Sequence, residues 1–279
     1  MSAPPARGSF AVDAIAFWAP TLPGWSHARG AFRDEQLPLA APAKRPAPEL
    51  LAAAERRRVP DTVALALEVA ATAVRASGRD AVALPSVFTS THGDLAVSDY
   101  MCATLASSPT LISPTRFHNS VHNAAAGYWT IATGCRETST ALSAFDASFA
   151  AGLLEAASQC RTDDRAVLLV AFDVEASGAL ASVVASEGLL ACALVLAPSA
   201  GPTSVYTIDW QLERETVAAP ALRSAAARSL AGNAMAGALP VLEALATADR
   251  GDASLALPIA PSLALRLTAR ALAAAGEHP

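Results

Sequence analysis

Residues 113–134 read SPTRFHNSVHNAAAGYWTIATG, and residues 138–156 follow as TSTALSAFDASFAAGLLEA. The first stretch begins as a polar loop and continues with residues whose pattern predicts a helix over about 121–133. The second stretch opens with a β-branched run that predicts a strand over 138–145, and its small and apolar residues predict a helix over 146–160. This part of the chain therefore predicts the order helix, strand, helix.

Further strands and helices flank this order on both sides. The apolar run at 81–93 predicts a strand that opens into a polar, glycine-ended turn, residues 94–106 resume a helical pattern, and RAVLLVAFDV at 165–174 predicts a buried strand. Nearer the N-terminus, FAVDAIAFWAP at 10–20 predicts an opening strand. The alternation of strands and helices predicts an α/β layered domain with a largely parallel sheet.

The most complete helix signal covers residues 61–78, DTVALALEVAATAVRASG, with Asp61 as the expected N-cap and a glycine at the end. Residues 34–60, rich in proline, alanine and charge, predict a surface loop with one short helix near 47–58. Four later segments predict two strands that are antiparallel to each other, then a helix, then one or two closing strands; they are 188–199, 203–212, 233–248 and 253–270.

Composition excludes several classes of protein. The 20 basic and 25 acidic residues leave a net charge of −5 without long blocks of like charge, which argues against non-specific electrostatic binding to nucleic acid. No apolar run reaches the ~18 residues of a membrane-spanning helix, and the N-terminus does not read as a secretory signal, so we expect a cytoplasmic protein. The cysteines form no C-x-x-C pair and are expected to be buried thiols; they are Cys102, Cys135, Cys160 and Cys192.

Taken in order, these segments resemble the β-ketoacyl synthases of the thiolase fold. In that family Ser-Pro and aromatic residues lead into an Asn-containing run that ends in Ala-Gly, then a helix, a glycine, and the strand that ends at the nucleophilic cysteine. Residues 113–134 and 138–156 follow this order, and the strands at 81–93 and 165–174 match the family's neighbouring strands. The resemblance covers about residues 80–200 and implies a layered thiolase-like fold, with a complete N-terminal half and a shortened C-terminal half.

The resemblance also shows where this chain departs from the family. The place of the acyl-accepting cysteine, at the N-terminus of a helix that favours a thiolate, holds Phe145. Phenylalanine is not a nucleophile, and the neighbouring Asp146 is unsuited to stabilising a carbanion. Ser148 lies three positions later, but a catalytic serine needs a base and an oxyanion hole, so we interpret it as a hydroxyl that packs within the helix.

A second departure concerns the histidines. Ketosynthases use two histidines of the C-terminal half for condensation, whereas the only histidine after residue 200 here is His278. The resemblance therefore implies a chain length factor, the non-catalytic partner of a type II ketosynthase, of the aryl polyene type. Such a subunit would act in polyketide or fatty acid biosynthesis as a heterodimer that receives its substrates from an acyl carrier protein, without a cofactor.

In thiolase-fold dimers the loop that corresponds to Thr115, Arg116 and Phe117 crosses the two-fold interface and closes the far end of the partner's acyl pocket. The resemblance thus predicts that these side chains limit chain length; an interface loop without that role is the equally weighted alternative. For Phe145 the alternatives are blocking an acyl tunnel and filling the space that cysteine and substrate vacate. The residues assigned to the partner interface or acyl tunnel are Thr115, Arg116, Phe117, His118, Asn119, Asn123, Phe145, Asp146, Ser148 and Phe149.

Other interpretations remain open for the polar residues. His118 and His122 have the spacing of a metal pair on one helix face, but no third ligand is close in sequence, so we favour a hydrogen-bonding role at a subunit interface and expect no metal. The run Arg56, Arg57 and Arg58 is either a docking patch for an acidic acyl carrier protein or a solvated helix end.

We therefore interpret residues 1–279 as a single truncated ketosynthase-like domain, with a thiolase-like half over about 1–200 and a reduced C-terminal part over about 201–279. The missing half predicts an incompletely covered apolar surface. The alternative function is an enzyme, an acyltransferase or hydrolase acting on carrier-bound acyl groups through Ser148 or His118; a homodimer that regulates carrier proteins is a third possibility.

Overall fold

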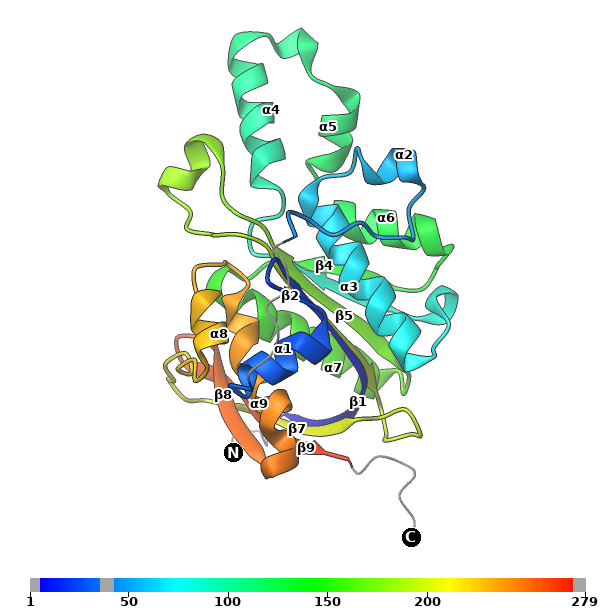
Figure 1. Ribbon diagram of the computed structural model, residues 1–279, viewed down its shortest axis with the longest axis vertical. Coiled ribbons are helices and arrows are strands. Elements are labelled where there is room, and N and C mark those ends of the chain that lie inside the picture. The colour runs from blue at the N-terminus through cyan, green and yellow to red at the C-terminus, as the bar shows by residue number, and fades with distance from the viewer. Residues whose placement is uncertain (1–5, 36–42, 273–279) are drawn as a thin grey trace, which may run out of the picture.

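The computed structural model describes residues 6–35 and 43–272, and these residues form one nine-stranded sheet with helices on both faces (Figure 1). The strand order is β4-β3-β5-β6-β1-β7-β9-β8, and β2 pairs onto β1. The strands are β1 (Arg7–Ala19), β2 (Leu22–Pro23), β3 (Ser86–Thr89), β4 (Ser139–Leu142), β5 (Val167–Asp173), β6 (Leu190–Ala197), β7 (Tyr206–Glu213), β8 (Ala253–Ala260) and β9 (Leu263–Ala271).

β1 lies at the centre of the sheet because, from Phe10 to Ala19, every side chain except that of Asp13 is apolar, so both faces of this part can be buried. It pairs antiparallel with β6 over Ala11–Trp18 and with β7 over Arg7–Val12. The strand predicted at 10–20 is thus confirmed. Its position between β6 and β7 joins the part of the sheet formed by β4, β3, β5 and β6 to the part formed by β7, β9 and β8.

The prediction of a largely parallel sheet is wrong. Only β3 with β4 and β3 with β5 are parallel among the eight strand pairings of the described residues. A parallel pair needs a crossover, usually a helix, and the segment between β5 and β6 holds only the short 3-10 turn Gly178–Ser182, so the chain returns antiparallel. The strands expected at 188–199 and 203–212 exist but do not pair with each other, because β1 lies between them.

Two hydrophobic cores cover the two faces of the sheet. On one face α3 (Asp61–Ser77) packs against β1, β5 and β6, and α6 (Ala124–Thr133) packs beside α3 on β3 and β4. On the other face α7 (Ser148–Thr162) lies under β3 and β5 and also contacts β8, while α9 (Leu239–Thr247) packs on β8 and β9. The sheet therefore bends around α7, and the result is a layered α/β arrangement.

The helix predicted at 61–78 is confirmed, with one difference at its start. Gly78 ends α3 in the left-handed conformation at φ 67°, as expected. The N-cap is Pro60, and Asp61 is the first helical residue; its carboxylate forms an ion pair with Arg45 at 3.0 Å instead of capping the helix.

The remaining helices lie around this framework. α4 and α5 form a hairpin that projects beyond the end of the sheet (Figure 1). Asp94 caps α4 by accepting a hydrogen bond from the Val97 N–H, and Ser113 caps α5 in the same way through Arg116. The helices of this group are α1 (Trp25–Phe32), α2 (Ala53–Arg56), α4 (Leu95–Ser107), α5 (Pro114–Asn119) and α8 (Ala225–Ser229).

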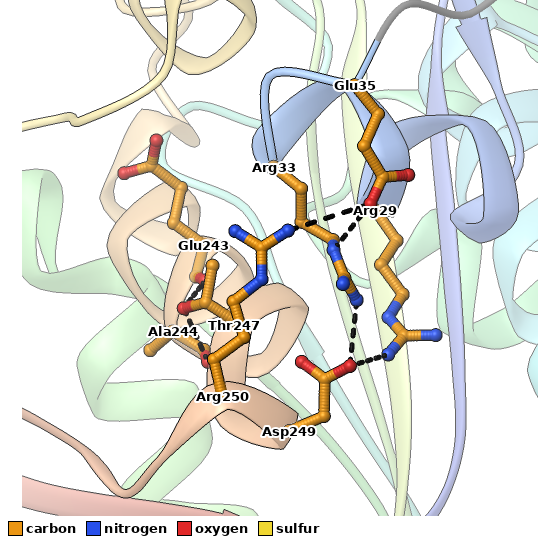
Figure 2. A network of polar contacts seen from close by, with 8 residues as sticks. All are labelled: Arg29, Arg33, Glu35, Glu243, Ala244, Thr247, Asp249 and Arg250. Carbon is orange, nitrogen blue, oxygen red and sulfur yellow. Dashed lines mark hydrogen bonds and ion pairs between the residues drawn. The ribbon is translucent and has the colours of Figure 1, made fainter.

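A charged cluster ties α1 to the end of α9, as Figure 2 shows. Asp249 accepts hydrogen bonds from Arg29 at 3.1 Å and from Arg33 at 2.9 Å, and Arg33 also pairs with Glu35 at 2.7 Å. Deeper in α9, the buried Glu243 carboxylate accepts the backbone N–H and hydroxyl of Ser224, both at 2.7 Å. These contacts hold α1 and the segment before α8 against α9.

The C-terminal strands do not leave the uncovered apolar surface that the shortened C-terminal part predicted. β7 and β9 alternate, with Ile208 and Leu267 buried against α7 and α9 and charged residues on the outer face. Arg270 of β9 pairs with Asp209 of β7 at 2.5 Å and with Asp252, which directly precedes β8, at 2.8 Å. Solvent therefore meets a polar face, and this surface needs no covering layer.

The cysteine prediction holds for three of the four residues. Cys135, Cys160 and Cys192 are buried, and burial raises the pKa of Cys160 and of Cys192 to about 12. Cys102 is exposed, because it lies on the projecting helix α4, which packs on little besides α5 and the turn after β5.

His278 lies outside the described residues. Within the described ranges no helix is long and apolar enough to cross a bilayer, and no cluster of three or more metal-ligating side chains forms.

Candidate functional site

The carboxyl ends of the parallel strands β3, β4 and β5 meet at one edge of the sheet, and most of the candidate residues lie there. The turn Ser90–Gly93 follows β3, the turn around Phe145 follows β4, and Asp173 ends β5. α3 runs opposite to these strands, so its first turn and the arginines before it reach the same edge. In open α/β sheets this is the edge where ligands bind.

Asp173 is the centre of the polar contacts at this edge. Its buried carboxylate accepts hydrogen bonds from the Ser90 hydroxyl at 2.7 Å, the Thr91 N–H at 2.9 Å and the His92 N–H at 3.4 Å. Asn233 donates to the Asp173 backbone carbonyl at 3.3 Å, which adds the loop before α9 to the cluster. We did not predict this residue, although an acid at the end of the apolar run VLLVAFD is an unusual signal.

Burial raises the pKa of Asp173 above its ordinary value of 3.8, and the hydrogen bonds from Ser90, Thr91 and His92 oppose that rise. Because the folded protein binds this proton more tightly than the unfolded chain, the resulting stabilisation is greatest at low pH and is lost as pH rises through the raised pKa.

We expect the unfolding free energy of the wild type, relative to Asp173→Asn, to fall as pH increases from about 3.5 toward neutrality and then to level off, since asparagine does not titrate. Urea unfolding of both proteins across this range measures the difference, and other titrating groups cancel. A difference that grows with pH would contradict the raised pKa.

Phe145 occupies the turn between β4 and α7 in a strained conformation. Its φ is 48°, a left-handed value that bulky residues rarely adopt, and its side chain is 77% exposed. The side chain fills no interior space of this chain, so the space-filling interpretation is wrong for the chain alone. Asp146, beside it, is also exposed, whereas Phe149 in the next turn is buried in the core.

Ser148 holds this turn together. Its buried hydroxyl donates to the Phe145 carbonyl at 2.6 Å and accepts the Ala144 N–H at 3.0 Å. The Ser148 carbonyl in turn accepts the Thr89 hydroxyl at 2.8 Å. No histidine or carboxylate of the described residues hydrogen-bonds to the serine hydroxyl, so these contacts do not assemble a nucleophile with a base.

α5 presents most of the predicted interface residues at the surface of the hairpin. Thr115, Arg116, Phe117 and His118 are exposed, with Phe117 61% exposed, and only Asn119 is buried. The Arg116 guanidinium stacks on the Tyr100 ring of α4 at 4.4 Å, and the His118 ring meets the Tyr128 ring edge to face at 6.0 Å.

His118 and His122 do not share a helix face, because α5 ends at Asn119 and α6 begins at Ala124. The His122 ring nitrogen contacts the Ser90 carbonyl at 2.9 Å, which connects α6 to the turn after β3. Asn123 is the exposed N-cap position of α6, without a side-chain cap. The metal-pair interpretation gains no support from this geometry.

The three arginines at 56–58 lie just before α3 and form no ion pair with a described residue. Arg57 and Arg58 are exposed, and the Arg56 carbonyl accepts a hydrogen bond from the Arg45 guanidinium at 3.0 Å. Together these three arginines form a basic rim just before the first turn of α3.

Comparison with known proteins agrees with this geometry. Residues 30–255 match the family model of the N-terminal domain of β-ketoacyl synthases. No curated protein matches the chain.

Among solved structures, the chain is similar to a chain of the complex of a ketosynthase (ApeO) with its chain length factor (ApeC) from Xenorhabdus doucetiae. The two chains are 24% identical, the match covers 94% of this chain and 99% of that chain, and the TM-score is 0.68. It is also similar to the ishigamide ketosynthase/chain length factor, at 16% identity, 95% and 100% coverage, and a TM-score of 0.67. A type II polyketide synthase ketosynthase in complex with its acyl carrier protein, AntDE:AntF, gives 11% identity, 96% and 100% coverage, and a TM-score of 0.72.

Proposed function

The chain belongs to the β-ketoacyl synthase family, and from this membership we propose that it is a catalytically inactive chain length factor. Its fold is the layered α/β, thiolase-like fold of ketosynthases. We propose that it pairs in the cytoplasm with an active type II β-ketoacyl synthase and helps to set the length of a carrier-bound chain. The partner would supply the cysteine and histidines of condensation.

The observation that carries this proposal is the turn between β4 and α7. By the family resemblance this turn should present a cysteine, and here it presents Phe145, while the nearby Ser148 hydroxyl is engaged with the backbone of the same turn. Phe145 has a strained left-handed backbone conformation, and its side chain has no nucleophilic chemistry. A ketosynthase-like fold whose turn lacks the nucleophile fits a subunit that contributes structure and not condensation chemistry.

Surface chemistry supports a protein partner. Within the described residues β4 pairs only with β3, so its other edge has unpaired backbone groups. Large apolar side chains are exposed in the neighbouring segments, among them Phe117 on α5, Ile131 on α6 and Phe145. An open strand edge beside exposed apolar residues is typical of a protein interface.

The acyl carrier protein would reach the pair through the ketosynthase, and the basic rim at Arg56, Arg57 and Arg58 offers a matching charge for an acidic carrier. The similar ketosynthase/chain length factor structures support the ketosynthase as partner, and the similar ketosynthase in complex with its acyl carrier protein supports the carrier. An aryl polyene is the product class that we propose, following the sequence resemblance.

Phe117→Ala is expected to shift the main product of the reconstituted pair toward longer chains, by at least one extension unit, because a large exposed side chain on α5 is removed from the partner's pocket. The chain is co-expressed with the ketosynthase encoded beside it, one subunit is tagged and captured, and the products are analysed by mass spectrometry.

Val82→Ala is the matched control, since Val82 is also an exposed apolar residue but precedes β3 at the opposite end of that strand. A product distribution that does not change with Phe117→Ala would reject the chain-length role, and failure of the two proteins to co-purify would reject the pairing. Acyl transfer by the chain alone, abolished by Ser148→Ala with the fold intact, would favour the acyltransferase or hydrolase alternative.

A further inference from the structure

The α4–α5 hairpin, residues 95–119, projects beyond the sheet and has few buried residues to hold it there (Figure 1). Of the described residues of α4 only Leu95 and Val97 are buried, both in its first turn, and α5 buries only Asn119. Neither hydrophobic core of the described residues includes one from the hairpin. Because burial of apolar side chains is the main stabilising term in folding, the orientation of the hairpin depends on contacts along its side.

The β5–β6 loop, residues 174–189, makes such a contact. Its 3-10 turn Gly178–Ser182 packs against α4, and in Figure 1 the loop stands beside that helix. The base of the loop is closed by the Ser186 hydroxyl, which donates to the Val174 carbonyl at 2.7 Å and accepts the Ala234 N–H at 3.1 Å. The loop is therefore fixed at its base to the end of β5 and to the segment before α9, and its tip reaches α4.

One carboxylate joins the tip of the β5–β6 loop to α4. Asp99, the one charged residue of α4, accepts the Ala179 N–H at 3.0 Å. Ser177, the N-cap of the 3-10 turn, makes no side-chain cap hydrogen bond, so Asp99 supplies from another helix the acceptor that a capping side chain would supply. Gly178 has a φ of 65°, and a Cβ there would overlap the Asp99 carboxylate. Glycine at this position therefore permits the close contact.

The residue after Asp99 connects α4 to α5. The Tyr100 hydroxyl accepts the Ser113 N–H at 3.2 Å, and the Arg116 guanidinium stacks on the Tyr100 ring at 4.4 Å. Ser113 is the N-cap of α5, and Arg116 directly precedes the exposed Phe117. The position of Phe117 therefore depends on the orientation of α4, and the orientation of α4 depends on the β5–β6 loop.

We propose that Asp99 is a positioning residue, which joins α4 to the β5–β6 loop and holds the hairpin in one orientation, so that Phe117 ends the growing chain at one length. The role in chain length rests on the proposed function, whereas the anchoring of the hairpin does not. A hairpin released from the loop takes several orientations, because little else is buried along its side. The pair then makes a wider range of chain lengths and keeps the condensation reaction.

Hydrogen exchange of the purified full chain, followed by mass spectrometry, measures the anchoring without any partner. Asp99→Ala is expected to speed exchange of the α4 and α5 amides by about tenfold, because a hydrogen bond to a carboxylate is lost. Exchange in α3, which lies in the core, should not change. Asp99→Asn should recover most of the protection, since its amide oxygen still accepts the Ala179 N–H. Glu175→Ala, which removes an exposed acid at the start of the same loop, is the matched control and should leave exchange unchanged.

Gly178→Ala tests the same contact from the loop. The added methyl group takes the place of the Asp99 carboxylate, so exchange of the hairpin amides should again rise by about tenfold. The double variant of Asp99→Ala and Gly178→Ala should exchange no more than about twofold faster than Asp99→Ala alone, because one contact is broken only once. Two effects that multiply would show that Asp99 and Gly178 act independently and would overturn the proposal.

The product distribution of the co-purified ketosynthase pair measures the role in chain length. Asp99→Ala is expected to raise the share of products that are longer or shorter than the main one by about twofold or more, with the total yield kept. Asp99→Asn should restore the narrow distribution. A general loss of folding would instead lower the yield in both variants and would not separate them.

The two measurements keep this inference apart from the proposed function. Unchanged hairpin exchange in Asp99→Ala, or exchange that rises equally in α3, would overturn the anchoring. Faster hairpin exchange with an unchanged product distribution, in a pair whose products still respond to Phe117→Ala, would overturn the role of Asp99 in chain length. Products that respond to neither substitution would reject the chain-length function of the subunit, and hydrogen exchange alone then decides whether Asp99 anchors the hairpin.

Discussion

Asp173→Ala is expected to lower the free energy of unfolding by about 3–4 kcal/mol. The substitution removes the acceptor of three hydrogen bonds, from the Ser90 hydroxyl and from the N–H groups of Thr91 and His92. Ser90 and Thr91 are buried, so water does not readily replace the carboxylate, and each unsatisfied donor costs about 1–3 kcal/mol. Urea unfolding followed by circular dichroism measures the loss.

Asp146→Ala is the control for this effect, because Asp146 is an exposed acid in the neighbouring turn and its loss should change stability by less than about 0.5 kcal/mol. The loss of unfolding free energy in Asp173→Asn should lie between those of Asp173→Ala and Asp146→Ala, since the asparagine amide keeps one acceptor oxygen. If Asp173→Ala were as stable as the control, the turn Ser90–Gly93 would not depend on this carboxylate.

Arg79→Ala is expected to destabilise the protein by about 3 kcal/mol, the lower part of the range for breaking a buried ion pair. Asp13 lies at the bulge of β1, its side chain is fully buried, and Arg79 donates to it from two nitrogens at 2.7 and 2.6 Å. The Ser204 hydroxyl adds a third contact at 2.6 Å. Because Arg79 remains 38% exposed, the lower value is the appropriate one.

Thermal and urea unfolding measure this loss, with Arg136→Ala as an exposed arginine that forms no described ion pair. The double variant Asp13→Asn with Arg79→Ala should recover part of the stability, since it no longer buries an unpaired charge. Equal stability of Arg79→Ala and Arg136→Ala would show that Asp13 does not need its partner.

The parts of the fold that the sequence predicted are those with a local signal. The helix at 61–78 has an apolar face and a terminal glycine, and the strand at 165–174 is an uninterrupted apolar run, so both were placed to within a few residues. The order of helix, strand and helix around Phe145 supports the family resemblance, and the resemblance locates the turn.

The site was predicted less completely. The sequence predicts its residues on α5 and in the turn after β4, since they belong to the segment that carries the resemblance. It does not predict Asp173 and Asn233, because their roles depend on contacts with residues far away in the chain: Ser90 is 83 positions from Asp173. A single polar residue at a strand end does not reveal which backbone groups it will meet.

By itself the sequence determined the type and order of the elements and the absence of a cysteine from the turn at Phe145, because helix and strand periodicity and residue identity are local properties. Only the tertiary structure decided that β1 separates β6 from β7, that the outer face of β7 and β9 is charged, and that Asp173 joins three segments at one edge. The physical reason is that alternation along a strand specifies which face is buried but not which strand lies alongside, and that choice is made by packing and hydrogen bonds between distant residues.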